Sequence, residues 1–451
     1  MSREPSLAGV DPDQLTRLPP RILPLLYFGS AHISLALACL LVAWAPRAIA
    51  GFYYHSWMIA IVHLITLGWI TLSILGAIYI VGPTTLGMPL RARRGDYVAY
   101  AFAVIGVIGM VGHFWIQEFG GMAWSAATAT AGIAYVAARV LAGLRRSAAP
   151  AGVRLHLLLA CLNVFVAASM GILLGLDKVY HFLPGFVLSN VFAHAHLAAI
   201  GWATMMVVGV GYRLIPMTLL ARAPSGPTLF ASAVLIELGV LGLFVSLLRR
   251  SAWSELFGPL VVAGLLAFAV HVVQMIRRRQ SRRVGAPGLD FAVLHAASAG
   301  VWLVLAAALG LALLFASPSA WTLRAGLAYG VFGLLGFLAQ MVVAMEAQLV
   351  PLLAWYWASP RAQFGGALPP PRAMCDRMLQ GVVFLGWAFA VPAIAGGLFC
   401  DASKWLAAGA WVLFAAVLGA ALNNGFVLAY AFGREHRIPA SEWSSLRSPS
   451  V

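Results

Sequence analysis

Two histidines begin closely similar segments of the chain. The segment from His63 reads HLITLGWITLSILGAIYIVGP, and the segment from His196 reads HLAAIGWATMMVVGVGYRLIP. Both carry a Gly-Trp pair, a further glycine, a tyrosine and a final proline at the same distances from the histidine. An imidazole in an apolar helix either bonds a neighbouring helix or binds a metal. The repetition makes His63 and His196 candidate ligands of a metal or a metal-containing cofactor.

A third segment, residues 331–351, follows the same pattern more weakly. Gly336 and Pro351 keep their places, but Val331 stands where the other copies have histidine. Internal repeats indicate repeated structural units. We therefore predict three pseudo-symmetric four-helix arcs, each presenting its second helix in the same way.

Two further histidines, His113 and His194, are candidate metal ligands beside the first pair. His194 and His196 form an HxH pair. Residues two apart on a regular helix point about 200° apart, so the helix does not aim both at one metal. If His196 faces the interior of the bundle, we expect His194 to face another neighbour, with the helix bearing His113 as the candidate.

Two carboxylates, Glu237 and Glu346, fall within apolar runs. An ionised carboxylate inside a membrane is costly, so each is protonated, paired or facing a polar cavity. Both are candidates for a proton or ion path, and Glu346 is the stronger because Gln340 and Gln348 flank it. An interhelical hydrogen bond is the structural alternative.

These residues must be positioned by membrane helices. Hydrophobic residues make up 62% of the 451 residues, charged residues only 10%, and the mean hydropathy is +0.90. This composition excludes a water-soluble fold, in which about a quarter of residues are charged. Apolar runs long enough to cross a bilayer recur along the chain. We predict an all-α membrane protein with spans at residues 23–45, 57–81, 97–115, 122–143, 155–176, 186–215, 228–248, 256–276, 291–315, 325–353, 378–399 and 405–432.

The net charge of +15 has an uneven distribution. Most basic residues fall in the termini and in alternate loops, which is the positive-inside pattern and not that of a nucleic-acid-binding protein. We therefore expect an inner-membrane protein in a lipid bilayer, with cytoplasmic tails at residues 1–22 and 433–451.

The repeated HLxxxGW segment on spans two and six, within twelve spans in three arcs, resembles subunit I of the haem-copper oxidases and nitric oxide reductases, and also the NnrS-like haem proteins. The resemblance implies that His63 binds a haem iron, of b type, and that His196 binds copper. It also implies respiration, electron transfer or nitric-oxide chemistry, with a periplasmic electron donor or a second membrane subunit as partner.

The chain departs from that family at two places. The family carries further histidines on spans seven and ten, whereas residues 228–248 and 325–353 contain none. A complete oxygen-reducing centre is therefore not expected, and oxidoreductase turnover stays open. Three functions remain: a haem- or copper-binding relative of the oxidases, an NnrS-like accessory protein that handles metal or responds to nitric oxide, and a secondary transporter using Glu237 and Glu346.

Overall fold

The computed structural model describes residues 18–279, 290–358 and 370–431. Every regular element within these ranges is a helix, and 12 helices are long and apolar enough to cross a membrane. The chain is therefore an all-α polytopic membrane protein, as its composition predicted. The predicted tails lie mostly outside the described residues.

The spans form three successive units of four. Unit one comprises α2 (Leu23–Trp44), α4–η1–α5 (Ser56–His63, Leu64–Thr71, Leu72–Thr85), α6 (Arg94–Ile116) and α7 (Phe119–Leu144). Unit two comprises α8 (Ala151–Tyr180), α9–η2–α10 (Val187–His196, Leu197–Thr204, Met205–Leu219), α11 (Thr228–Leu248) and α12 (Ser254–Arg277). Unit three comprises α13 (Phe291–Phe315), α14–η3–α15 (Ala320–Val331, Phe332–Ala339, Gln340–Ala358), α16 (Arg377–Phe399) and α17 (Ser403–Ala431). Short helices α3 (Pro46–Ile49) and η4 (Pro371–Met374) lie in connections.

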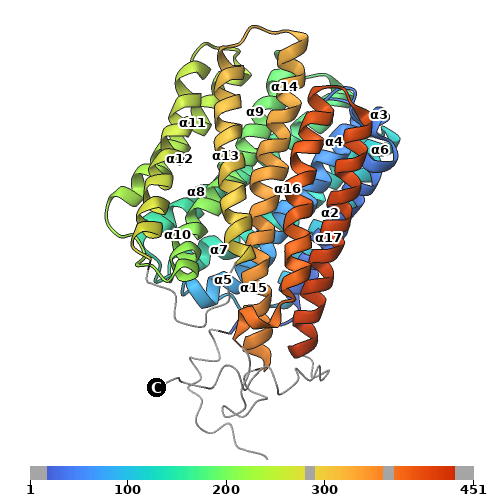
Figure 1. Ribbon diagram of the computed structural model, residues 1–451. Helices are drawn as coiled ribbons and strands as arrows, with labels where there is room; N and C mark the ends of the chain where they lie inside the picture. Colours follow the sequence, from blue (N-terminus) through green and yellow to red (C-terminus); the bar gives the residue numbers. More distant parts are fainter. Residues whose placement is uncertain (1–17, 280–289, 359–369, 432–451) are drawn as a thin grey trace, which may run out of the picture.

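The second span of each unit lies at the centre of the molecule. These inner spans are 72%, 50% and 61% buried over their most apolar stretches, whereas the other spans reach at most 44%. Segments η1, η2 and η3 contact one another, and α17 packs against α2 to join the last unit to the first. Figure 1 shows α2, α16 and α17 side by side along one flank. The second helices are thus presented to the centre, as the repeat predicted.

Each inner span changes its winding at the same place. The π-helical segments η1, η2 and η3 begin directly after His63, His196 and Val331, the first residues of the three aligned segments. A π-helix is uncommon and frequently marks a functional site. The repeat in the sequence therefore corresponds to a repeated backbone irregularity that hydropathy does not reveal.

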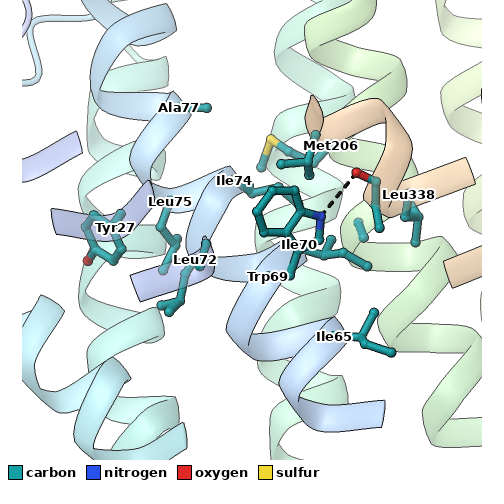
Figure 2. Packing of buried hydrophobic residues seen from close by; sticks show 14 of the residues in the cluster. Tyr27, Ile65, Trp69, Ile70, Leu72, Ile74, Leu75, Ala77, Met206 and Leu338 are labelled. Atoms are coloured by element: carbon teal, nitrogen blue, oxygen red, sulfur yellow. Dashed lines mark hydrogen bonds between the residues drawn. The ribbon is translucent and has the colours of Figure 1, made fainter. Parts of the chain in front are cut away.

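Two tryptophans connect the inner spans in a cyclic order. Trp202 of η2 donates its indole N–H to the Thr71 hydroxyl of η1 (3.1 Å), and Trp69 of η1 donates to the Ala339 carbonyl of η3 (3.1 Å). Figure 2 shows the second bond beside Met206 and Leu338. Thr71 and Ala339 occupy the same position in their repeats, so the two bonds obey the pseudo-threefold symmetry of the bundle.

The inner spans of units two and three extend further than the sequence predicted. Pro216 and Pro351 lie inside α10 and α15, which continue to Leu219 and Ala358, beyond the predicted span ends at residues 215 and 353. A proline removes one N–H donor from the helix, and membrane helices tolerate this loss where neighbouring groups satisfy the freed carbonyl. These two predicted boundaries were therefore too early.

Candidate functional site at the histidine end

The inner spans have two chemically different ends. We call the end formed by α4, α9 and α14 the histidine end, because His63 and His196 are the last residues of α4 and α9. The opposite end, formed by α5, α10 and α15, is the basic end, because most loop arginines lie there. The labels of the two helix sets occupy opposite ends of the bundle in Figure 1.

His63 and His196 hold their rings in the same way. In each, Nδ1 lies 2.8 Å from the carbonyl oxygen four residues earlier, that of Ile59 or Phe192. The bond fixes the tautomer with hydrogen on Nδ1, which leaves Nε2 as the nitrogen able to bind a metal. The His63 ring also stacks on Phe114 of α6 at 5.4 Å, so its orientation is set from two sides.

The backbone bond alone does not distinguish a ligand, because His32, His156 and His271 make the same bond. The state of Nε2 separates His63 from His156 and His271. Nε2 is 2.9 Å from the Ser232 hydroxyl in His156 and 3.0 Å from the Thr228 hydroxyl in His271. These two histidines are structural. Among the described residues, His63 has no hydrogen bond at Nε2.

His194 approaches His63 and not His113. Its Nδ1 lies 3.0 Å from the Ala167 carbonyl oxygen of α8, and its ring packs closely against Gly171 of the same helix. His194 and His63 are near enough to interact electrostatically. The separation of the HxH pair was therefore expected correctly, but the neighbour named for His194 was wrong.

His113 lies apart from the other three histidines, at the corner between α6 and α7. Its Nδ1 is 3.1 Å from the Ser125 hydroxyl, and its Nε2 is 3.6 Å from the Glu118 carboxylate. Glu118 caps α7 by accepting from two backbone N–H groups. Across the described residues, no three His, Cys, Asp or Glu side chains are placed to hold a metal ion. The four histidines named from the sequence thus do not form one cluster.

Tyr329 is a site residue that the sequence did not identify. Its hydroxyl lies 3.2 Å from Nε2 of His196, and the two rings stack at 5.9 Å. It stands two residues before Val331, as His194 stands two residues before His196. In both repeats this position lies near the leading histidine of the preceding inner span. The comparison of the repeats missed this position because it lies two residues before the first residue of the aligned segments.

The histidines at this end are less buried than the residues that follow them on the first inner span. His63, His196 and Tyr329 are half-buried, whereas six of the eight residues of η1 and nearly all of α5 are buried. A Cβ placed at Gly330 or Gly333, which follow Tyr329 in the chain, would meet no atom within 4 Å.

The two membrane carboxylates have unlike surroundings. Glu237 accepts a hydrogen bond from the Asn163 amide (2.7 Å), which connects α11 to α8 in the manner of the structural alternative. Glu346 is 3% exposed, and its Oε2 lies 3.5 Å from Nε2 of His32. Asn424 also donates to Glu346 Oε2 at 3.2 Å. No chemistry was expected of His32.

No protein-family model matches the chain, and no curated protein matches it.

Proposed function

We propose that this chain is a haem-binding integral membrane protein, built like subunit I of the haem-copper oxidases but without a complete oxygen-reducing centre. One observation carries the proposal. His63 is a half-buried membrane histidine with its tautomer fixed and with no hydrogen bond at Nε2 within the described residues, directly before the first of the three repeated π-helical segments. A free imidazole in this place is costly unless it binds something.

The residues around His63 fit a haem held through its iron. Nδ1–H of His63 bonds the Ile59 carbonyl, and such a bond increases the donor strength of Nε2 toward a metal. Phe114 holds the plane of the ring, and His194 approaches from the next inner span. A bound haem supplies one-electron redox chemistry or an open position for a small gas. The protein's part is to orient the imidazole and exclude bulk water.

A copper centre of the family's kind does not fit the described residues. His196 has only the Tyr329 hydroxyl near its Nε2, and no third ligand is placed beside the pair. The proposal therefore assigns haem to His63 and gives His196 a positioning role with Tyr329. If the function is oxidase-like, we expect an electron donor or a second subunit to bind at the histidine end. An NnrS-like function requires neither partner.

We further infer that the basic end faces the cytoplasm of a cell with an inner membrane. The described loop arginines gather there, including Arg91, Arg93, Arg145, Arg146 and Arg222. Arginine and lysine are retained on the cytoplasmic side during insertion. The haem site then lies in the outer half of the bilayer.

The proposal is tested on protein purified in detergent from haem-replete cells. A reduced-minus-oxidised spectrum and quantified iron and copper are recorded for the native chain, His63→Ala and His55→Ala. His55 caps α4 from outside the span and serves as the matched control. We expect a Soret band with stoichiometric iron in the native chain and in His55→Ala, and its loss in His63→Ala. Iron-free native protein would overturn the proposal.

A further inference from the structure

The same position of each inner span points into the four-helix interior of its own unit at the basic end. In the aligned segments this position holds Tyr79, Tyr212 and Ala347. Two units therefore place a phenol in their interior, and unit three places a methyl group there. The surroundings of the three positions show what the missing phenol leaves behind.

In unit one the tyrosine completes a satisfied polar cluster. The Tyr79 hydroxyl donates to the Asp96 carboxylate at 2.7 Å, and Arg139 donates to both oxygens of Asp96 at 2.8 and 2.7 Å. The Arg93 backbone N–H donates to the same carboxylate at 2.6 Å. Asp96 is fully buried. Both oxygens of the Asp96 carboxylate therefore have partners.

In unit two the tyrosine meets neutral partners. The Tyr212 hydroxyl is 2.9 Å from the Ser232 hydroxyl and 3.3 Å from Nδ1 of His271. His156 reaches the same serine. These hydrogen bonds join all four spans of the unit.

In unit three a cavity occupies the interior. It offers about 30 Å³ to the centres of water molecules, enough for about two waters. Its polar lining comes from α13, α15, α16 and α17: His295, Glu346, Gln380, Asn423 and Asn424. Ala347 lines it, as do Phe291, the first residue of α13, and Gln380 in the first turn of α16. The cavity therefore begins near the basic end and reaches inward to Glu346.

Glu346, which lines this cavity, has one oxygen without a partner. Within the described residues, Glu346 Oε1 and the neighbouring His32 Nε2 are buried and have no hydrogen bond, while Ser73 lies close enough to interact with the Glu346 carboxylate. His32 is 8% exposed and Ser73 is fully buried. A native structure rarely leaves buried polar atoms unpaired unless water, an ion or a proton shuttle satisfies them. A water in the cavity would lie against Glu346.

We propose that Glu346 and His32 form a buried proton-exchange site, reached from the basic end by water in the unit-three cavity. The pair shares one proton, as a carboxylic acid beside neutral imidazole or as carboxylate beside imidazolium. A proton arriving from cavity water binds Glu346 and leaves by the same route, so no bond other than O–H or N–H changes. The ligand class is a proton carried by water.

The groups facing Glu346 are consistent with proton exchange. Ser73 faces it from α5, Asn424 from α17 and His295 lines the cavity from α13. None of these carries a fixed charge. Arg372 and Asp290, at the basic end of the same unit, pair with each other at 3.0 Å. None of these neighbouring groups therefore gives Glu346 a permanently charged partner in place of the shared proton.

The test measures protonation directly and needs no haem, so it fails or succeeds separately from the proposed function. Infrared difference spectra of the full chain in detergent follow the carbonyl band of a protonated carboxylic acid during transfer from H₂O to D₂O. We expect a band that disappears in Glu346→Gln and persists in Glu237→Gln. Absence of any Glu346-dependent band at every pH examined would overturn the proposal.

Filling the cavity tests the route. Ala347→Leu should slow deuterium exchange of the Glu346 band at least tenfold, because the added side chain displaces the water. Ala347→Ser, matched in size to the native residue, should exchange at the native rate. If Ala347→Leu is not monodisperse, Val383→Ile narrows the cavity from α16. Exchange as fast as native in a folded cavity-filling variant would contradict the water route.

Discussion

The interiors of units one and three show how one fold position serves two purposes. In unit one Tyr79, Asp96 and Arg139 join three spans through a satisfied ion pair. In unit three Ala347 leaves a cavity, and Glu346 stands beside it with one oxygen unpaired. The same position can therefore hold a tyrosine that completes a polar cluster in one unit and an alanine that leaves space for water in another.

The difference is also one of charge compensation. A buried carboxylate held by arginine, a phenol and a backbone N–H is fixed in its ionised form, because removing any partner leaves a charge unpaired. A buried carboxylate beside histidine and amide groups has only titratable or neutral neighbours. The first arrangement stabilises the bundle, and the second is able to exchange a proton.

The largest effect is expected from breaking the ion pair of unit one. Asp96→Asn leaves Arg139 half-buried without its counter-charge and should lower the free energy of unfolding by about 3–5 kcal/mol. The midpoint of unfolding in detergent measures it. Asp290→Asn is the control, because Arg372, the partner of Asp290, is 52% exposed to solvent, and the pair should contribute about 1 kcal/mol or less. Equal losses of unfolding free energy in Asp96→Asn and Asp290→Asn would contradict the structural role assigned to the ion pair of unit one.

A smaller effect is expected from the phenol hydroxyl alone. Tyr79→Phe removes one hydrogen bond while Arg139 still pairs with Asp96, so the loss should be about 1 kcal/mol. Tyr27→Phe is the matched control: Tyr27 is fully buried beside Tyr79, and its hydroxyl has no hydrogen-bond partner within the described residues. It should be neutral or slightly stabilising. A larger loss for Tyr27→Phe than for Tyr79→Phe would contradict these assignments.

The orientation of the protein in the membrane is tested by labelling the native cysteines at the two ends of α16, which should not change stability. Cys400 follows α16 at the histidine end and is exposed, whereas Cys375 precedes it at the basic end. A membrane-impermeant maleimide should label Cys400 in intact cells. Burial raises the pKa of Cys375 to about 11, so at pH 8 about one thiol in a thousand is thiolate and labelling stays slow after lysis. Labelling of Cys400 only after lysis would reverse the orientation.

The fold was predicted well because hydropathy and the internal repeat can both be recognised from short stretches of the sequence. The sequence identified twelve spans and the centre of the molecule from His63, His196 and residues 331–351. It could not predict η1, η2 and η3, since a π-helix differs from an α-helix by a small change of winding without a composition of its own. Longer-range contacts also escaped it.

The site was predicted only in part, for a similar reason. His63 and His196 were found by repetition, but His32 gains meaning only through Glu346, which lies on a different span far along the chain. Asp96 and Arg139 were passed over because each stands near a helix end, where charges are ordinary. His113 was named with the other histidines from the sequence, which does not give the direction in which a side chain points.

Rescue of the variant His63→Gly by free imidazole tests most directly the central claim that His63 binds haem. His63→Gly removes the imidazole and leaves room for a free one. The proposal predicts that purified His63→Gly has no Soret band after haem is added, and that imidazole restores the band with native-like absorption. A native band in His63→Gly without imidazole would contradict His63 as the haem ligand, as would a folded variant that imidazole fails to rescue.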